Sequence, residues 1–589
     1  MNTRSGGCRV AIAILIGALC APALGSQQSS SAPDLLVSRG DVGRPGGQIV
    51  IALRAEPRTF NPVTALDSPS REVIRRTIGD LIHVNRETQQ TEPALAKSWH
   101  VSADGRTYTV TLRQGIRFSD GDPFDADDVV FSFQVYLDEK VGSTNRDFLT
   151  IEGKPIAVRK VDRYTVEFSL AQPYAAAERL FDSIAMLPSH LLARAYKERR
   201  LGATWGVQTE AAAMAGLGPF RFKEYVPGQR VVLERNPFFW KVDRAGHRLP
   251  YMDRVVFLIV PSEDAQVLRF QSGDADIVTR ISAANFNVLS RTQRTANYEL
   301  YDVGASLNYT FLFFNQSAVE SRGLTEISRK QSWFRRLPFR QAVSLAIDRN
   351  AIVRLAFRGR ATPLWGHLPP GNTWVDRSLP RPEHSVERAR QLLRAAGFGW
   401  TADGTLIDEK AQPVEFSIVT NTGNAERIQI ATIIQDDLKR LGMRARVVTL
   451  ELRALIDRVL TTYDYEACVL GLGGGDVDPN AELNLWLSSG SQHLWRMGEP
   501  KPATPWEEEI DTLMRRQLTV LDRRERKRLY DRVQQLVVQH LPIIPLVSPN
   551  LLVGANKGLG NFRPTILEHH ALWNVEELFW RERRSGAPR

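Results

Sequence analysis

The sequence contains very few cysteines, with three among 589 residues, at positions 8, 20 and 468. The first two lie in an N-terminal segment that we expect to be removed, which leaves Cys468 alone. A single thiol cannot form an intramolecular disulfide, whatever the redox state of the compartment. A fold that depends on disulfides is therefore excluded.

Sequence motifs of common catalytic sites are also missing. The chain has no His-Glu-x-x-His, no Cys-x-x-Cys pair, no Gly-x-Ser-x-Gly and no glycine-rich loop ending in Gly-Lys-Ser/Thr. The ten histidines are dispersed, and the one adjacent pair, His569-His570, lacks a nearby thiol or a spaced third ligand for a metal. We therefore expect no enzyme activity, no bound metal and no cofactor.

Long apolar runs are scarce, and the clearest one lies at the N-terminus. Arg4 and Arg9 precede the apolar run 10–19, and small residues follow it. The run is shorter than the roughly 20 apolar residues of a membrane-spanning helix, and this order is typical of a secretory signal peptide. We predict cleavage before Ser26, removal of residues 1–25 and a periplasmic protein.

Two alternatives to a freely diffusing protein stay open. One is an uncleaved N-terminal anchor. The other is a lipid on Cys20, although Leu19 is larger than the small residue that lipoprotein signals carry at that position. We prefer the free periplasmic protein.

The excess of basic residues is modest for a chain of this length. Lysine and arginine total 76 against 66 acidic residues, a formal charge of +10 that falls to +8 without Arg4 and Arg9. Apolar residues make up 43% and charged residues 24%, close to globular averages, which excludes disordered and multi-span membrane classes. Export separates the protein from nucleic acid, so we expect a basic surface and no nucleic-acid partner.

The length predicts roughly three to four domain-sized units. Residues 26–47 are rich in Ser, Gly and Pro and are interpreted as a flexible linker, with folded structure starting at Gln48. Apolar periodicity and end signals predict alternating strands and helices, which indicates α/β layers. The expected strands are 48–53, 107–113, 255–260, 414–420 and 444–450, and the expected helices are 126–137, 338–357, 385–396 and 425–441.

One long segment resembles a known family. The stretch from Glu92 to Phe133, with its EPALAKSW, YTVTLRQGIRFSDGDPF and ADDVVFSF pieces, is similar to the hallmark segment of extracellular solute-binding family 5. That family comprises the oligopeptide-, dipeptide- and nickel-binding proteins of ABC importers. Further family-like segments follow in the same order, at 217–220, 235–240, 339–349, 395–398 and 541–546, so the resemblance spans residues 48–580.

The resemblance implies an α/β, two-lobed periplasmic-binding-protein-like fold of type II with an extra inserted domain. Its parts would be lobe I at 48–68, 218–305 and 540–589, the inserted domain at 69–217, and lobe II at 306–539. Two chain crossings, near Gly304–Tyr309 and near His540, would form a hinge. Ligand would lie between the lobes, a preferred place for small-molecule sites.

By position, the loop 471–480 resembles the loop that supplies backbone contacts and an aspartate for the peptide amino terminus in peptide-binding relatives. Glycines allow close approach of backbone to a ligand, and aspartates accept hydrogen bonds from a cationic group. The alternative is an Asp-rich turn that satisfies its own backbone. The candidate ligand-binding residues are Gly473, Gly474, Asp476, Asp478 and Asn480.

Three further candidates complete the predicted site. Ser68 lies in segment 67–71, where relatives pair a strand with an extended peptide, although Pro69 removes one backbone donor. Trp486 and Trp495 flank a polar run that would suit a sugar or a peptide equally. Their alternative role is to anchor a surface loop or to lie in the core.

These observations predict the exported solute-binding component of an ABC importer. It would capture a peptide-like small solute between two lobes that close by a hinge, and deliver it to the ABC transporter permease subunits in the inner membrane. We expect a monomer. The alternatives are the same module with an oligosaccharide or a chelated metal as cargo, or, from a different class, an exported peptide hydrolase.

Overall fold

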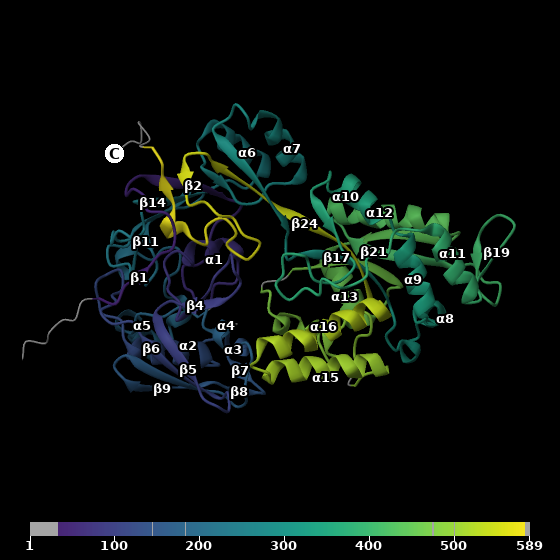
Figure 1. The fold of residues 1–589 in the computed structure, drawn as a ribbon, viewed down its shortest axis with the longest axis horizontal. Helices are drawn as coiled ribbons and strands as arrows, with labels where there is room; N and C mark the ends of the chain where they lie inside the picture. Colours follow the sequence, from purple (N-terminus) through teal and green to yellow (C-terminus); the bar gives the residue numbers. More distant parts are fainter. Residues whose placement is uncertain (1–32, 144, 183, 474–475, 500, 583–589) are drawn as a thin grey trace, which may run out of the picture. The chain divides into compact units, whose positions relative to one another are not determined.

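One long strand, β24 (Ile543–Asn556), connects the two halves of a 12-stranded sheet (Figure 1). A computed structural model describes residues 33–582, apart from 144, 183, 474–475 and 500. Twelve of the fourteen residues of β24 are buried, as expected for a strand that is covered on both faces. Its first part pairs antiparallel with β17 (Tyr309–Phe314) and β18 (Ala361–Pro363), and its last part pairs antiparallel with β15 (Ile277–Val278) and β16 (Tyr298–Ala305).

The first half of the sheet is built around β2 (Gln48–Leu53). This strand pairs in parallel with β14 (Arg254–Ile259) and with β15, and Ile49 and Ile51 are completely buried. The strands predicted at 48–53 and 255–260 are therefore confirmed. The remaining elements of this half are β11 (Phe220–Val226), β12 (Arg230–Arg235), α6 (Glu263–Ser272) and α7 (Ala283–Thr292).

The second half continues from β24 through β17 to β23 (Ala467–Leu472), β21 (Glu415–Asn421) and β22 (Arg444–Leu450). All six residues of β17 are buried, and Cys468 is buried in β23. The helices of this half are α8 (Thr325–Phe334), α9 (Leu337–Ala346), α10 (Arg349–Ala356), α11 (Val386–Ala395), α12 (Ala425–Arg440), α13 (Leu452–Asp457), α15 (Pro505–Thr519) and α16 (Arg523–His540).

Capping residues explain where these helices begin and end. Ser385 accepts a hydrogen bond from the backbone of α11, and Gly397 has a φ of 87° just after that helix, which a side chain would disfavour. The helices predicted at 385–396 and 425–441 are confirmed as α11 and α12. The single helix predicted at 338–357 is wrong, because Asp348 caps a new helix, α10, and interrupts the run after Ala346.

Residues 69–217 contain a separate four-stranded antiparallel sheet with the order β5 (Ala96–Val101), β6 (Thr107–Leu112), β10 (Thr165–Ser169), β9 (Ala157–Asp162). Tyr108, Val110 and Leu112 are buried, which confirms the alternation predicted for this strand. The other elements of this region are α1 (Ser68–Ile74), β3 (Ile82–Val84), β4 (Thr91–Pro93), α2 (Ala126–Leu137), α4 (Ala177–Leu180) and α5 (Ser189–Lys197). The sheet and α2 share one hydrophobic core, which also includes Phe239, Trp240, Leu249 and Tyr251 from outside this region.

The chain passes between the two halves of the large sheet at two adjacent places. After β16, the backbone N–H of Ser306 donates to the carbonyl of Pro549 at 3.0 Å, and the Ser548 hydroxyl donates to the carbonyl of Ser306 at 2.9 Å. Strand β24 pairs with the second half as far as Pro549 and with the first half from Asn550 onward. The second crossing therefore lies nine residues after His540, the position predicted from sequence.

Folded structure starts before Gln48. Within the segment predicted as a linker, β1 (Leu36–Val37) pairs in parallel with β13 (Lys241–Val242), and Asp34 pairs with Lys97 at 2.8 Å. Residues 33–47 are thus part of the folded body. The predicted signal peptide and linker residues 26–32 lie outside the described residues.

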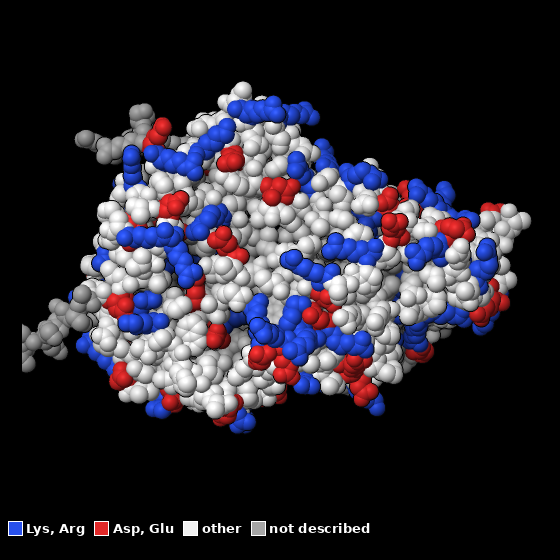
Figure 2. All heavy atoms as spheres, in the orientation of Figure 1, with Lys and Arg blue, Asp and Glu red and all other residues white. Residues whose placement is uncertain are grey.

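Short elements complete the described chain. Within it, no helix is long and apolar enough to cross a membrane. Basic and acidic side chains are interspersed on the face shown in Figure 2, as in an ordinary solvated surface. The short elements are α3 (Asn145–Phe148), α14 (Leu483–Trp486), β7 (Thr150–Ile151), β8 (Lys154–Pro155), β19 (Gly399–Trp400), β20 (Leu406–Ile407), β25 (Leu559–Gly560), β26 (Phe579–Trp580), η1 (Leu201–Ala203), η2 (Ala211–Ala213), η3 (Glu320–Arg322), η4 (Arg458–Thr462), η5 (Pro479–Glu482) and η6 (Val575–Glu577).

Candidate functional site

A cavity of about 430 Å³ lies against both crossings, and we call it the crossing cavity. This volume is within the range of small-molecule sites in proteins, roughly 300–1,000 Å³. Both crossings and both halves of the large sheet contribute to its walls. The lining residues are Arg71, Arg280, Ile281, Ser306, Leu307, Asn308, Gly473, Pro549, Asn550, Leu551, Leu552, Ile566, Glu568 and His570.

Gly473 and Asn308 approach closely at one wall of the crossing cavity. Gly473 follows β23, and a Cβ atom added to it would lie 2.8 Å from the Asn308 Oδ1 atom. A side chain at position 473 would therefore force Asn308 to move or would project into the cavity. The structure places this predicted residue on the cavity wall, whereas Gly474 lies outside the described residues.

Charged groups of the lining come from α1 and from the segments around 280 and 570. The Arg280 Nη2 atom lies 3.1 Å from the His570 Nε2 atom. Burial, and then the positive charge of Arg280, lower the pKa of His570 to about 4, so this imidazole is neutral at pH 7. Arg71 and Glu568 are half exposed and their charged atoms are 3.9 Å apart, a weak interaction in solvent.

Asp476, the first predicted carboxylate, is held by an arginine. The Arg179 Nε atom, in α4, donates to Asp476 Oδ2 at 2.8 Å, and Arg179 Nη2 donates to the other oxygen. The backbone N–H of Val477 donates to Asp476 Oδ1 at 2.6 Å. The carboxylate is thus already paired with a guanidinium, and it is not among the residues that line the crossing cavity.

Asp478, the second predicted carboxylate, lies in a buried network. Its side chain is 5% exposed and accepts two hydrogen bonds from Arg526 of α16, one of them at 2.7 Å. It also accepts from the backbone of Asn480 at 3.1 Å and so caps η5. The Asn480 Oδ1 atom accepts from Arg526 and from Gln517. The Asp478 carboxylate therefore stabilises a turn of its own backbone, which is the alternative interpretation of this loop given above.

The chain is similar in sequence and in structure to known proteins of one family. A model of the bacterial extracellular solute-binding proteins, family 5 (middle part), matches residues 90–493, more than half of the chain. The chain belongs to this family. The structure resembles the ABC transporter substrate-binding protein CtaP from Listeria monocytogenes, with a TM-score of 0.72 and 24% identity over 92% of this chain and 100% of that one.

Two relatives align with this family 5 protein over nearly the whole length of both chains. A probable ABC transporter-binding protein of Deinococcus radiodurans is 27% identical over 557 residues, 90% of this chain and 92% of the relative. The oligopeptide-binding protein AppA of Bacillus subtilis is 25% identical over 576 residues, 94% of each chain. The predicted α/β, two-lobed periplasmic-binding-protein fold is confirmed. Members of the family are binding proteins rather than enzymes, and they act outside the cytoplasm.

The remaining predicted residues do not line the crossing cavity of the family 5 protein. Trp486 and Trp495 are almost completely buried, and their indole N–H groups donate to Glu482 at 2.8 Å and to Glu507 at 3.1 Å. Both therefore lie in the core, as one of their predicted alternatives. Ser68 is exposed at the start of a helix, because Asp67 caps α1 and Pro69 suits its first turn. The segment 67–71 is thus the start of a helix and not a strand in this structure.

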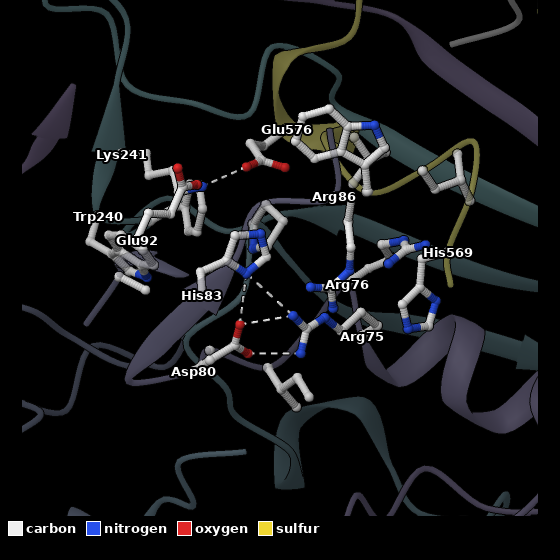
Figure 3. Close-up of a pocket in the computed structure, with 18 of the residues that line it drawn as sticks. Arg75, Arg76, Asp80, His83, Arg86, Glu92, Trp240, Lys241, His569 and Glu576 are labelled. Carbon is white, nitrogen blue, oxygen red and sulfur yellow. Dashed lines mark hydrogen bonds and ion pairs between the residues drawn. The ribbon is translucent and has the colours of Figure 1, made fainter. Parts of the chain in front are cut away.

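A second, smaller cavity of about 70 Å³ is lined by charged side chains, and we call it the charged cavity (Figure 3). Arg75 donates to both oxygens of Asp80 at 2.9 and 2.8 Å, and Lys241 pairs with Glu576 at 2.8 Å. Arg86 pairs with Asp182, which also accepts from Arg75. This volume holds only a few water molecules.

A cluster with metal-ligand chemistry borders the charged cavity, with Asp80 and His83 in the lining and Asp182 next to them. Potential ligand atoms of Asp80, His83 and Asp182 lie within 4.8 Å of one another. Arg75 and Arg86 already pair with these carboxylates, so a divalent cation would have to displace two guanidinium groups. The donor set therefore fits an internal ion-pair network better than a metal site.

Most residues of the crossing cavity carry no signal in the sequence. The segment Gly304–Tyr309 was predicted as a crossing and supplies Ser306, Leu307 and Asn308. Arg71 falls within the segment considered for peptide pairing. His570 was considered only as a metal ligand. Arg280 and Glu568 stand in no recognisable pattern, because their role depends on contacts between distant segments.

Proposed function

We propose that this family 5 protein is the solute-binding component of an ABC importer, with a peptide-like solute as its cargo in the crossing cavity. The observation that carries the proposal is the position of the cavity against both crossings. Names of relatives support it, since one is described as an ABC transporter-binding protein and another as an oligopeptide-binding protein.

The two crossings would act as the hinge, at residues 305–309 and 547–550. A ligand that contacts both halves of the large sheet favours the arrangement in which both contacts exist at once. In this proposal, lobe I comprises 48–68, 218–305 and the residues from 550, with 69–217 inserted, and lobe II comprises 306–549. The boundary moves from 539 to 549 because β24 pairs with the second half as far as Pro549.

We further propose that the protein works in the periplasm as a monomer after removal of residues 1–25, and that it delivers its cargo unchanged to the permease. A lipid on Cys20 would tether the same binding unit to a membrane. Mass spectrometry of the protein isolated from its own periplasm tests both points. An N-terminus at Ser26 supports release, and a diacylated Cys20 contradicts it.

A substitution at Gly473 tests the cavity itself. Gly473→Leu places a side chain against Asn308 on the cavity wall, so we expect at least about a tenfold loss of peptide affinity from lost shape complementarity. Gly202→Leu is the matched control, because Gly202 is exposed and nothing lies within 4 Å of its added Cβ.

Isothermal titration with a pool of synthetic peptides of two to six residues provides the measurement. Equal affinity in the Gly473 variant and the control would show that solute binds elsewhere. Hydrolysis of the peptides during incubation would favour the peptide hydrolase, and recovery of intact peptide supports binding without turnover.

A further inference from the structure

We propose that the crossing cavity selects its solute by an anionic group and does not require a free amino terminus. This inference rests on the proposed function and specifies the class of solute. It depends on two independent features of the described residues. One is the occupation of the predicted amine-binding carboxylates, and the other is the charge of the cavity wall.

Neither predicted carboxylate is free to bind a ligand ammonium. Asp476 contacts Arg179 through both oxygens, and Asp478 contacts Arg526 through both oxygens. A paired, two-point contact with a guanidinium is among the stronger side-chain interactions, because both hydrogen bonds are charge-assisted. An incoming ammonium group would have to displace an arginine that the fold already holds in place.

The burial of Asp478 strengthens this argument. Asp478 and Arg526 are 5% and 4% exposed, so separating them would leave two buried charges without solvent or an oppositely charged partner. Asp478 also caps η5, and Asn480 completes the network. Asp476 is more accessible, at 38%, but its partner Arg179 is 13% exposed and also donates to the carbonyl of Gln89 at 3.1 Å. Both arginines are therefore anchored by contacts beyond the aspartates.

The cavity wall, in contrast, presents positive charge. Arg71 and Arg280 both line it, against the single carboxylate of Glu568. Within the described part of the chain, no carboxylate lies within 4.0 Å of the Arg280 guanidinium, whose partner is the neutral His570. The charge of this guanidinium is therefore not balanced by a carboxylate of the described residues, and further N–H donors are available to a ligand.

His570 fixes the orientation of Arg280. The His570 Nδ1 atom lies 3.2 Å from the carbonyl oxygen of Thr565, which accepts a hydrogen bond from the Nδ1–H group. In a neutral ring, Nε2 then carries no proton and accepts from Arg280. This arrangement points a preorganised guanidinium at the cavity, which suits a carboxylate or another planar anion. For a peptide, the anion is either the terminal carboxylate or an acidic side chain.

The test compares chemically matched peptides. Ala-Ala-Ala-Ala and Ala-Glu-Ala-Ala are each prepared with free or acetylated amino termini and with free or amidated carboxyl termini, and affinities are measured by titration calorimetry at pH 7. We expect acetylation to change affinity by less than about threefold, and removal of all carboxylates to weaken it by about tenfold or more, the range of charge-assisted hydrogen bonds. The glutamate peptides show whether a side-chain carboxylate substitutes for the terminal one.

Two variants assign the effect to residues. Arg280→Gln keeps a hydrogen-bond donor but removes the charge, and it should abolish the preference for carboxylate-bearing peptides. Arg294→Gln removes an exposed arginine that does not line the cavity, and it should leave the preference unchanged. Asp476→Asn should not alter the response to acetylation.

The possible outcomes are distinct. A tenfold loss on acetylation that disappears in Asp476→Asn would overturn the inference, since Asp476 would then bind the amino terminus. Binding that is indifferent to amidation in both peptide series would also overturn it while leaving the proposed function intact. Failure of every form to bind, together with failure of the wider peptide pool, would contradict the proposed function and with it this inference.

Discussion

The crossing cavity and the charged cavity are bordered by the same two segments, but their charged side chains are paired differently. In helix α1, Arg71 lines the crossing cavity, whereas Arg75 and Arg76 line the charged cavity. The same alternation occurs at the other end of the chain, where Glu568 and His570 line the first and His569 lines the second. Residues that are close together in the sequence thus line two different cavities.

The difference lies in how completely the charges are paired. In the charged cavity, each arginine and the lysine have a carboxylate partner at 2.6–2.8 Å, and the pairs are mostly buried. In the crossing cavity, Arg280 has a neutral imidazole as its partner, and Arg71 has an exposed carboxylate at 3.9 Å. Buried, satisfied charges stabilise a unique fold when intact, whereas accessible and unsatisfied charges are available to a ligand.

The largest expected effect comes from breaking the charged cavity. Asp182 accepts from Arg75, from Arg86 and from the backbone N–H of Val84. Burial raises its pKa, but the charges of Arg86 and Arg75 and the contact with His83 outweigh burial and hold the pKa well below the usual range. We expect Asp182→Asn to lower the free energy of unfolding by about 3–5 kcal/mol, because two buried guanidinium groups lose a charged partner. Urea unfolding followed by circular dichroism measures this change.

The matched control for this experiment is Asp127→Asn. Asp127 pairs with Lys160 at 2.7 Å, but its side chain is 66% exposed. Its loss should cost at most about 1 kcal/mol. Similar losses in both variants would show that the charged cavity is no more stabilising than the surface.

Sequence patterns predict the fold better than they predict either cavity. Alternation in 107–112 and the caps at Ser385 and Asp125 are local signals, and the strands and helices that they indicate are present. Gly473 and the crossing near 304–309 were instead expected from the resemblance to family 5, not from a local pattern. Arg179 and Asp476 are 297 residues apart, so no local pattern shows that they neutralise each other.

The two cavities should also respond to pH with opposite signs. Burial lowers the pKa of His83, but hydrogen bonds to Asp182 and Asp80 outweigh it and raise the pKa above its ordinary value. This contribution to stability is fully present below pH 6.5 and is lost as the pH rises through the folded-state pKa. For His570, whose pKa is lowered from 6.5 to about 4, the contribution is present above pH 6.5 and is lost as the pH falls toward 4.

Unfolding midpoints measured from pH 4 to 9 test these signs. His570→Gln should flatten the loss of stability between pH 6.5 and 4, which amounts to at most about 3 kcal/mol for a shift of this size. His83→Gln should instead flatten the loss above pH 6.5. Flattening on the same side of neutrality in both variants would contradict the contrast between the cavities.

The smallest expected effect comes from the exposed ion pair at the wall of the crossing cavity. Arg71 and Glu568 are 51% and 50% exposed, and their 3.9 Å separation is near the limit for an ion pair. We expect Arg71→Gln, Glu568→Gln and the double variant each to change the free energy of unfolding by less than about 0.5 kcal/mol, since solvent already screens both charges. The same urea titration serves here, with additivity of the two single changes as the internal check. A loss of more than about 2 kcal/mol, or strong coupling between the two positions, would mean that this wall is structural, like that of the charged cavity.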